Sequence, residues 1–189
     1  MRAVMLRPPE SFLEERRRLG HDRWDEVWDG VLHMIPPPSM QHQWFGFELA
    51  SELRPVARKR GLKISHETGV FRPGTGDRDY RVPDFVIWKP EQFSKRGVEG
   101  RCELIIEMLS PDDESRDKLP FYAEMEIPEV WLVDPQSKQI ELYVLRGRAY
   151  HVVAADEQGS VRSPLLGTTL RTVTGPYLAV ITDEGTVEI

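Results

Sequence analysis

Two carboxylate side chains stand in segments of the chain where a charge is costly. Glu107 lies inside the apolar run 104–109, and Asp84 directly precedes the apolar residues 85–88. Both runs have the composition of buried strands, in which Asp and Glu are rare. An isolated buried carboxylate must take up a proton, pair with a cation or bind a metal ion. Both residues are therefore candidates for chemistry, the alternative being strand ends that are exposed or paired with an arginine.

A divalent cation would resolve the repulsion between these two carboxylates if their strands are neighbours, about 4.8 Å apart. Oxygen ligands from one or two carboxylates, completed by water, a backbone carbonyl and substrate phosphate, suit Mg²⁺ or Mn²⁺ better than Zn²⁺. Cys102 is the single cysteine, so one protomer cannot build a cysteine-based zinc site. The pattern indicates phosphate chemistry without zinc.

A lysine follows at a distance that suits such a site. Lys118 and Tyr122 are four residues apart in a segment, 115–125, of helical composition, so a helix would present them on one face. If that helix packs on the sheet, the ammonium can reach the carboxylates and stabilise developing negative charge. The alternative is a solvated surface lysine.

Two helices and a hairpin are expected before the main strands. Ser11 and Glu14 have the spacing of a capping box for a short helix ended by Gly20. Asp29-Gly30 between two apolar-rich runs predicts a tight hairpin. Ser39 is the expected N-cap of a longer helix, which Pro55 would kink or end early and which stops by Gly61 at the latest. Its core stripe is Phe45, Leu49, Leu53 and Val56, and His42 begins that stripe.

The remainder of the chain changes to short runs rich in Val, Ile and aromatic residues. With helices between them, these strands predict an α/β or α+β fold, a mixed central sheet flanked by helices. The expected strands are 62–71, 82–88, 102–109, 130–133 and 140–145, with further strands or edge elements at 149–155 and 165–170.

Length and composition describe one domain. The chain has 189 residues, of which we expect 1–21 to be an N-terminal helical extension, 22–170 the core and 182–189 a polar tail. The longest apolar stretch, 177–181, is far below the roughly 18 residues of a membrane helix. The single cysteine and the lack of an apolar leader segment indicate a cytoplasmic protein. The formal net charge of −6 argues against coating nucleic acid through bulk electrostatics.

Several short segments occur in a distinctive order along the chain. They are Glu26-Val27-Trp28-Asp29-Gly30, 36–42, Pro83-Asp84, 107–111, Asp117-Lys118, Tyr122 and 128–135. This ordered set resembles the Uma-type restriction endonuclease family, over roughly residues 22–170. By that resemblance the chain is similar to the PD-(D/E)XK nuclease superfamily. The resemblance implies a restriction-endonuclease-like core and metal-dependent hydrolysis of phosphodiesters.

The resemblance assigns the central residues of a site. Asp84 corresponds to the acid of the family's Pro-Asp motif, and Glu107 to its second metal-binding carboxylate. The superfamily pattern has a lysine two positions after that carboxylate, whereas this chain has Leu109, so the strict motif is broken. In the Uma-type pattern the cation comes from the following helix, where Lys118 stands. Mg²⁺, or Mn²⁺, would be held by both carboxylates and the backbone carbonyl of Met108.

Three further residues would support the site. Glu26 and His42 match the family's upstream glutamate and histidine, so the resemblance makes them possible metal or water ligands, although a histidine on an apolar face is more often a core residue. Tyr122 shares the helix face of the catalytic lysine candidate.

The resemblance predicts a Mg²⁺-dependent DNA endonuclease, and cleavage of a duplex by a chain with one site implies a homodimer. One alternative is an inactive module with the nuclease fold that binds nucleic acid or a protein. Another is a metal-dependent phosphoesterase for RNA or a small substrate. A binding module needs a basic strip, for which the candidates are Arg54, Arg58, Lys59 and Arg60, with Arg72, Arg78 and Arg81.

Overall fold

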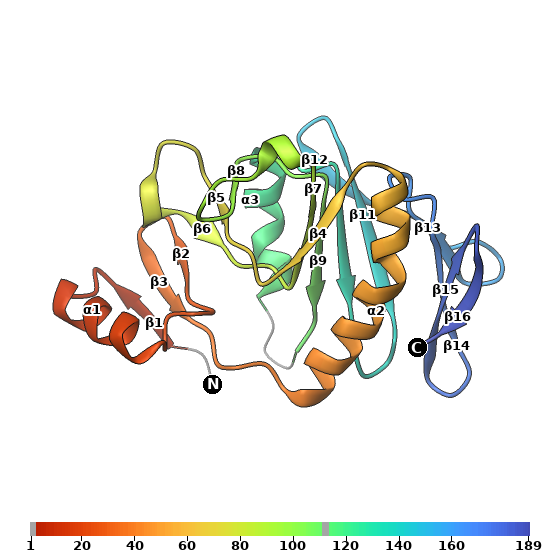
Figure 1. Cartoon of the computed structure of the whole chain (residues 1–189), viewed down its shortest axis with the longest axis horizontal. Coiled ribbons are helices and arrows are strands. Elements are labelled where there is room, and N and C mark those ends of the chain that lie inside the picture. Colours follow the sequence, from red (N-terminus) through yellow and green to blue (C-terminus); the bar gives the residue numbers. More distant parts are fainter. Residues whose placement is uncertain (1–2, 111–113) are drawn as a thin grey trace.

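A mixed central sheet forms the middle of the molecule (Figure 1). The computed structural model describes residues 3–110 and 114–189, and within these ranges the chain forms three sheets and three α-helices. The central sheet pairs β9 with β10 in parallel and its other neighbours antiparallel, so the predicted fold class is confirmed. Its order is β12 (Ala149–Val152), β11 (Ile140–Arg146), β10 (Glu129–Val133), β9 (Leu104–Met108), β7 (Phe85–Trp88) and β4 (Lys63–His66).

Helices cover the two faces of this sheet. Figure 1 shows α2 (Met40–Lys59) and α3 (Leu119–Glu124) on opposite sides of it. Successive strand residues point to opposite faces, so Leu104 and Ile106 pack with α2, whereas Ile105 packs with α3. Glu107, next in the alternation, therefore points toward α3.

The longest helix begins where the sequence predicts. The Ser39 side chain accepts a hydrogen bond from the backbone N–H of His42 at 3.2 Å, which makes it the N-cap. The early end considered at Pro55 does not occur: the helix continues to Lys59, within the predicted limit of Gly61, with the proline exposed to solvent. Gly46 permits close approach to the sheet, since a Cβ there would lie 3.1 Å from Cε2 of Phe85.

A second sheet collects the N-terminal strands. The predicted hairpin is present, and Asp29 and Gly30 both have positive φ, 48° and 85°, as a type I′ turn requires. This N-terminal sheet has the order β1 (Ala3–Leu6), β3 (Val31–Met34), β2 (Glu26–Trp28), β6 (Tyr80–Arg81), β5 (Val70–Phe71) and β8 (Val98–Glu99), with 3₁₀ turns at Gly76–Arg78 and Pro90–Gln92.

The first helix, α1 (Glu10–Leu19), has a different start from the one predicted. It begins after Pro9 with no side-chain cap, so the capping role expected for Ser11 is wrong. The predicted end is correct, because Gly20 adopts the left-handed conformation with φ 67°. Within the described ranges, no helix is both long enough and apolar enough to cross a membrane.

Two expectations about strands also need correction. The run 62–71 is not one strand: it divides into β4 and β5, in different sheets, because Glu67 has φ 46° and breaks the extended backbone. Residues 182–189 include β16, and Ile189 is buried, so this segment is ordered by pairing in a third sheet. That sheet has the order β13 (Ser160–Arg162), β14 (Thr169–Val173), β15 (Tyr177–Thr182) and β16 (Gly185–Glu188).

We predict that Leu53→Ala lowers the free energy of unfolding by about 2–5 kcal/mol, because it leaves a cavity between α2 and the sheet. Leu53 is 0% exposed. Urea unfolding followed by circular dichroism measures the change. Ser51→Ala, on the exposed side of the same helix, should stay within about 0.5 kcal/mol of the parent protein; an equal loss in both variants would contradict the assigned faces.

Candidate active site

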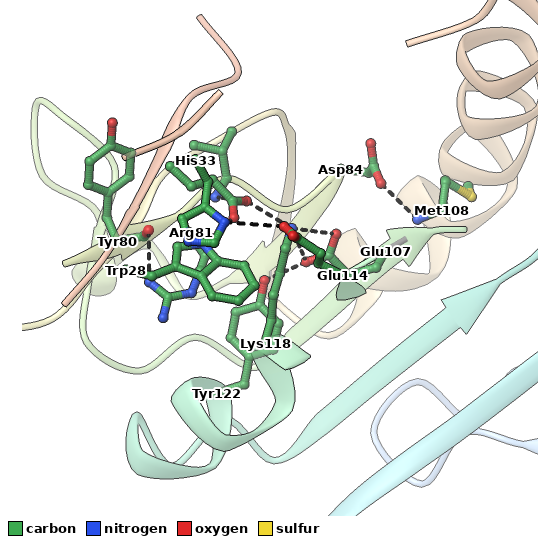
Figure 2. A network of polar contacts seen from close by, with 12 residues as sticks. Trp28, His33, Tyr80, Arg81, Asp84, Glu107, Met108, Glu114, Lys118 and Tyr122 are labelled. Atoms are coloured by element: carbon green, nitrogen blue, oxygen red, sulfur yellow. Dashed lines mark hydrogen bonds and ion pairs between the residues drawn. The ribbon is translucent and has the colours of Figure 1, made fainter. Parts of the chain in front are cut away.

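The register of the central sheet brings the two candidate carboxylates together. Phe85 of β7 pairs with Ile106 of β9 in an antiparallel register. Asp84, which precedes Phe85, and Glu107, which follows Ile106, are therefore neighbours. The Asp84 Oδ2 accepts a hydrogen bond of 2.7 Å from the backbone N–H of Met108 (Figure 2). Two residues 23 positions apart in the sequence thus meet at one edge of the sheet.

Lys118 lies between two buried glutamates, Glu26 and Glu107, and Figure 2 shows it beside Glu107. Lys118 is the last residue of the 3₁₀ turn Ser115–Lys118, which directly precedes α3. Its Nζ donates hydrogen bonds to Oε1 of Glu26 at 2.8 Å and to Oε2 of Glu107 at 3.2 Å. The Tyr122 hydroxyl donates to Oε1 of Glu107 from the next turn. All three charged residues are at most 6% exposed. The helix face predicted for the lysine and tyrosine therefore points at the carboxylate.

Glu26 reaches this cluster from the N-terminal sheet. Its Oε1 also accepts from the backbone N–H of Val82 at 2.9 Å, and its Oε2 from the indole N–H of Trp28 at 2.7 Å. These donors satisfy a carboxylate that is 1% exposed. Glu26 is thereby fixed in place independently of the central sheet.

His42 lies on the other side of Asp84. Its Nε2 is 3.4 Å from Oδ1 of Asp84 and 3.3 Å from the backbone oxygen of Met108. The two oxygens therefore converge on one nitrogen, contributed by the first turn of α2. The structure therefore brings together the residues predicted for the metal site and its support, whereas the predicted basic candidates do not line the cavity.

The two buried glutamates differ in acidity. Burial raises the pKa of Glu107 to about 8, and the charges of Asp84 and Glu26 add to this effect despite the nearby ammonium. Burial would also raise the pKa of Glu26, but the Lys118 charge and hydrogen bond, with those of Val82 and Trp28, outweigh it and lower that pKa. Of the two glutamates, Glu107 is therefore the one that takes up a proton first as pH falls.

The neighbouring groups shift in response to these carboxylates. Burial would lower the pKa of Lys118, but the charges of Glu107 and Glu26 raise it, so this lysine is a cation at neutral pH and not a base. Burial would likewise lower the pKa of His42, whereas its hydrogen bond to Asp84 and the carboxylate charge raise it.

The oxygen donors fit a hard divalent cation. Asp84 Oδ1 and the Met108 carbonyl point toward the same place, and Glu107 adjoins them on the next strand. In residues 3–110 and 114–189, no three His, Cys, Asp or Glu side chains form a set that could hold a metal. Mg²⁺ needs no such set, because it is commonly held by one or two carboxylates and keeps several waters.

A cavity of about 860 Å³ opens over these residues. It is bounded by the polar cluster, by the start of α2 and by the loop after β10. The lining includes Glu26, Glu67, Asp84, Glu107 and Asp134, with His42, Arg116 and Lys118. Carboxylates outnumber cations in this lining, so the cavity attracts positively charged species.

The sequence analysis missed Glu67. Its backbone N–H donates to the Asp84 carbonyl at 2.9 Å, and its carboxylate accepts from the amide of Gln43 at 3.0 Å and from the guanidinium of Arg23 at 2.9 Å. It therefore ties the start of α2 to the strand that leads into the site. A carboxylate inside the run 62–71 was an available signal for it.

An aromatic stack behind Glu26 was also missed. The Arg81 guanidinium lies 4.4 Å from the Trp28 ring and 4.2 Å from the Phe121 ring, and His33 stacks on Trp28 at 4.2 Å. The His33 Nδ1 is 3.2 Å from the Glu114 carboxylate. These contacts join the N-terminal sheet to α3 and hold the indole that donates to Glu26. Sequence spacing contains no sign of this stack.

Comparisons with known proteins identify a family and structural relatives. A family model described as "Uma2: Putative restriction endonuclease" matches residues 13–174. A crystal structure from Anabaena variabilis, described as "a putative nuclease belonging to DUF820", has a TM-score of 0.60 and 19% identity, over 76% of this chain and 83% of that one. No curated protein matches the chain. At this identity the structural likeness shows a shared fold.

We predict that Glu107→Gln changes how stability depends on pH. Because burial raises the Glu107 pKa to about 8, its contribution to stability is complete below its ordinary pKa and is lost as pH rises through 8. The parent protein should therefore lose up to about 1.4 kcal/mol per pH unit from this group over that window. Urea unfolding in EDTA between pH 5 and about 8.5 should show the loss in the parent and not in the variant; parallel curves would contradict the assigned proton.

Proposed function

Because the chain belongs to the Uma2 family, whose model covers residues 13–174, we propose that it is a metal-dependent phosphodiesterase that cleaves DNA. Family membership and fold together support a nuclease function. The observation that carries the proposal is the buried Lys118 ammonium held by Glu26 and Glu107, with Asp84 on the adjacent strand.

The residues would divide the work by position. Asp84, Glu107 and the Met108 carbonyl would hold Mg²⁺ or Mn²⁺, which when bound acidifies a water and neutralises phosphate charge. Glu26 would keep Lys118 beside the metal ligands, because it makes the shorter contact with the ammonium, 2.8 Å. The lysine, kept charged, would then stabilise negative charge on the phosphate.

Two residues would orient the carboxylates. The Tyr122 hydroxyl fixes one oxygen of Glu107, and the Met108 N–H fixes Oδ2 of Asp84. Oδ1 of Asp84 faces His42, which supports the opposite side of the cavity. Such fixed donors restrict each carboxylate to one rotamer before substrate arrives.

A binding module with the same fold is the second candidate. It is favoured by one observation, that Lys118 and Tyr122 already engage both oxygens of Glu107. In that case the ammonium would replace a metal permanently. Metal binding and turnover separate the two functions.

We predict that Asp84→Asn lowers Mg²⁺-dependent DNA cleavage by at least about 100-fold, because it weakens the metal site without adding bulk. Supercoiled plasmid, single-stranded DNA and RNA should be tested with Mg²⁺ and with Mn²⁺. Asp77→Asn is the matched control, since the Asp77 side chain is 82% exposed and pairs only with Arg96 among the described residues. Equal cleavage by Asp84→Asn and the parent protein would exclude the assigned site.

Metal affinity should rise with pH. Glu107, with a pKa of about 8, must lose its proton to bind a cation, so the Kd for Mn²⁺ should fall by up to about tenfold per pH unit below 8 and level off above it. Isothermal titration calorimetry in buffers of different ionisation enthalpy measures both the affinity and the released proton. Absence of Mn²⁺ binding, with a folded protein, would favour the binding module.

A further inference from the structure

The side of α2 that faces solvent carries large apolar residues. Met40, Trp44 and Phe47 are 88%, 56% and 70% exposed. They recur at spacings of four and three, opposite the buried stripe of the same helix, so they form one continuous row. Exposed hydrophobic residues on a protein surface are usually scattered singly. A contiguous row of them marks an interaction surface.

The same row continues with positive charge. Arg54 and Arg58 follow at helical spacing, and both are exposed. Within the described ranges, neither guanidinium forms an ion pair with a carboxylate. The two acidic residues of α2, Glu48 and Glu52, are half-buried, whereas Arg54 and Arg58 are exposed, in a chain whose net charge is −6. This face therefore complements a polyanion that also offers flat apolar groups.

The row adjoins the cavity of the candidate active site. Gln41 and His42, in the first turn of α2, line that cavity. Lys138 lies beside the row, with its ammonium 6.0 Å from the ring centroid of Trp44 and 3.4 Å from that of Phe45. It follows the loop residues 134–136, which also line the cavity. A nucleic-acid strand lying on α2 could thus continue directly to the carboxylates of the candidate site.

We propose that the solvent-facing row of α2 binds an unpaired nucleic-acid strand and leads it into the cavity. Bases stack on Trp44 and Phe47, and phosphates contact Arg54 and Arg58 toward the far end of the helix, about 21 and 27 Å along its axis from Met40. This inference rests on the proposed function and narrows its substrate class. The row binds unpaired bases because a duplex hides the ring faces that stacking requires.

Binding to a fluorescein-labelled deoxythymidine oligonucleotide tests this proposal. Fluorescence anisotropy is measured in EDTA, so that the result does not depend on cleavage. Trp44→Ala should weaken binding about tenfold, whereas Trp44→Tyr, which keeps a stacking ring, should retain most of the affinity. Tyr177→Ala, which removes a 48% exposed ring from β15, is the matched control and should bind like the parent protein.

The arginines are tested by salt dependence. The double variant Arg54→Ala/Arg58→Ala should reduce the slope of log K against log salt by roughly 1.4, since each lost phosphate contact removes about 0.7 on a single strand. Arg148→Ala, an exposed arginine between β11 and β12, should leave the slope unchanged.

Three results would overturn the proposal: unchanged binding by Trp44→Ala, an equal loss in Tyr177→Ala, or tighter binding of duplex than of single strand. Sedimentation equilibrium adds a further criterion. If Trp44→Ala converts a dimer to a monomer while oligonucleotide affinity stays constant, the row joins two copies of the chain instead. A protein that binds in EDTA but never cleaves with metal would contradict the phosphodiesterase and leave the strand-binding row intact.

Discussion

The contact between the Lys118 ammonium and the carboxylates of Glu26 and Glu107 is the constraint on which the rest of the site depends. Removing a charged group from water costs several kcal/mol, which only close partners with good geometry can offset. Here one cation serves two buried acids, and burial, together with the charges of Asp84 and Glu26, raises the pKa of Glu107. Under the proposed function a divalent cation would add to the compensation of these acids, with the oxygens of Asp84 and Met108 as further ligands.

The cluster exists because two sheets meet at α3. The central sheet supplies Glu107 through strand alternation, and the N-terminal sheet supplies Glu26, which the indole of Trp28 holds. The turn before α3 then inserts the lysine between them. The resulting cavity is acidic and suits cations, so a polyanionic substrate gains little from its walls alone. The solvent-facing side of α2 is basic and aromatic, so it is better suited than the acidic cavity to contact a polyanion.

Much of the fold could be predicted because its elements are encoded locally. The N-cap Ser39 and the turn at Asp29-Gly30 depend on neighbouring residues, and both have the predicted roles. Prediction failed where contacts between residues far apart in the sequence determine the structure. The run 62–71 has one composition but enters two sheets, and residues 182–189 look like a solvated tail until β15 pairs with them. The residues of the candidate site could be predicted for the same reason as the helices, because a carboxylate in an apolar run is visible in the local sequence.

The sequence by itself determined which residues were candidates for the site. Asp84 and Glu107 interrupt apolar strands, and Lys118 stands four residues before Tyr122, a spacing that any helix converts into a shared face. Only the tertiary structure decided which charges meet, because strand register and the junction of the two sheets set distances between residues that are remote along the chain. It also decided why Glu107 is the weaker acid of the two glutamates, since a pKa depends on burial and on neighbours that no local pattern specifies.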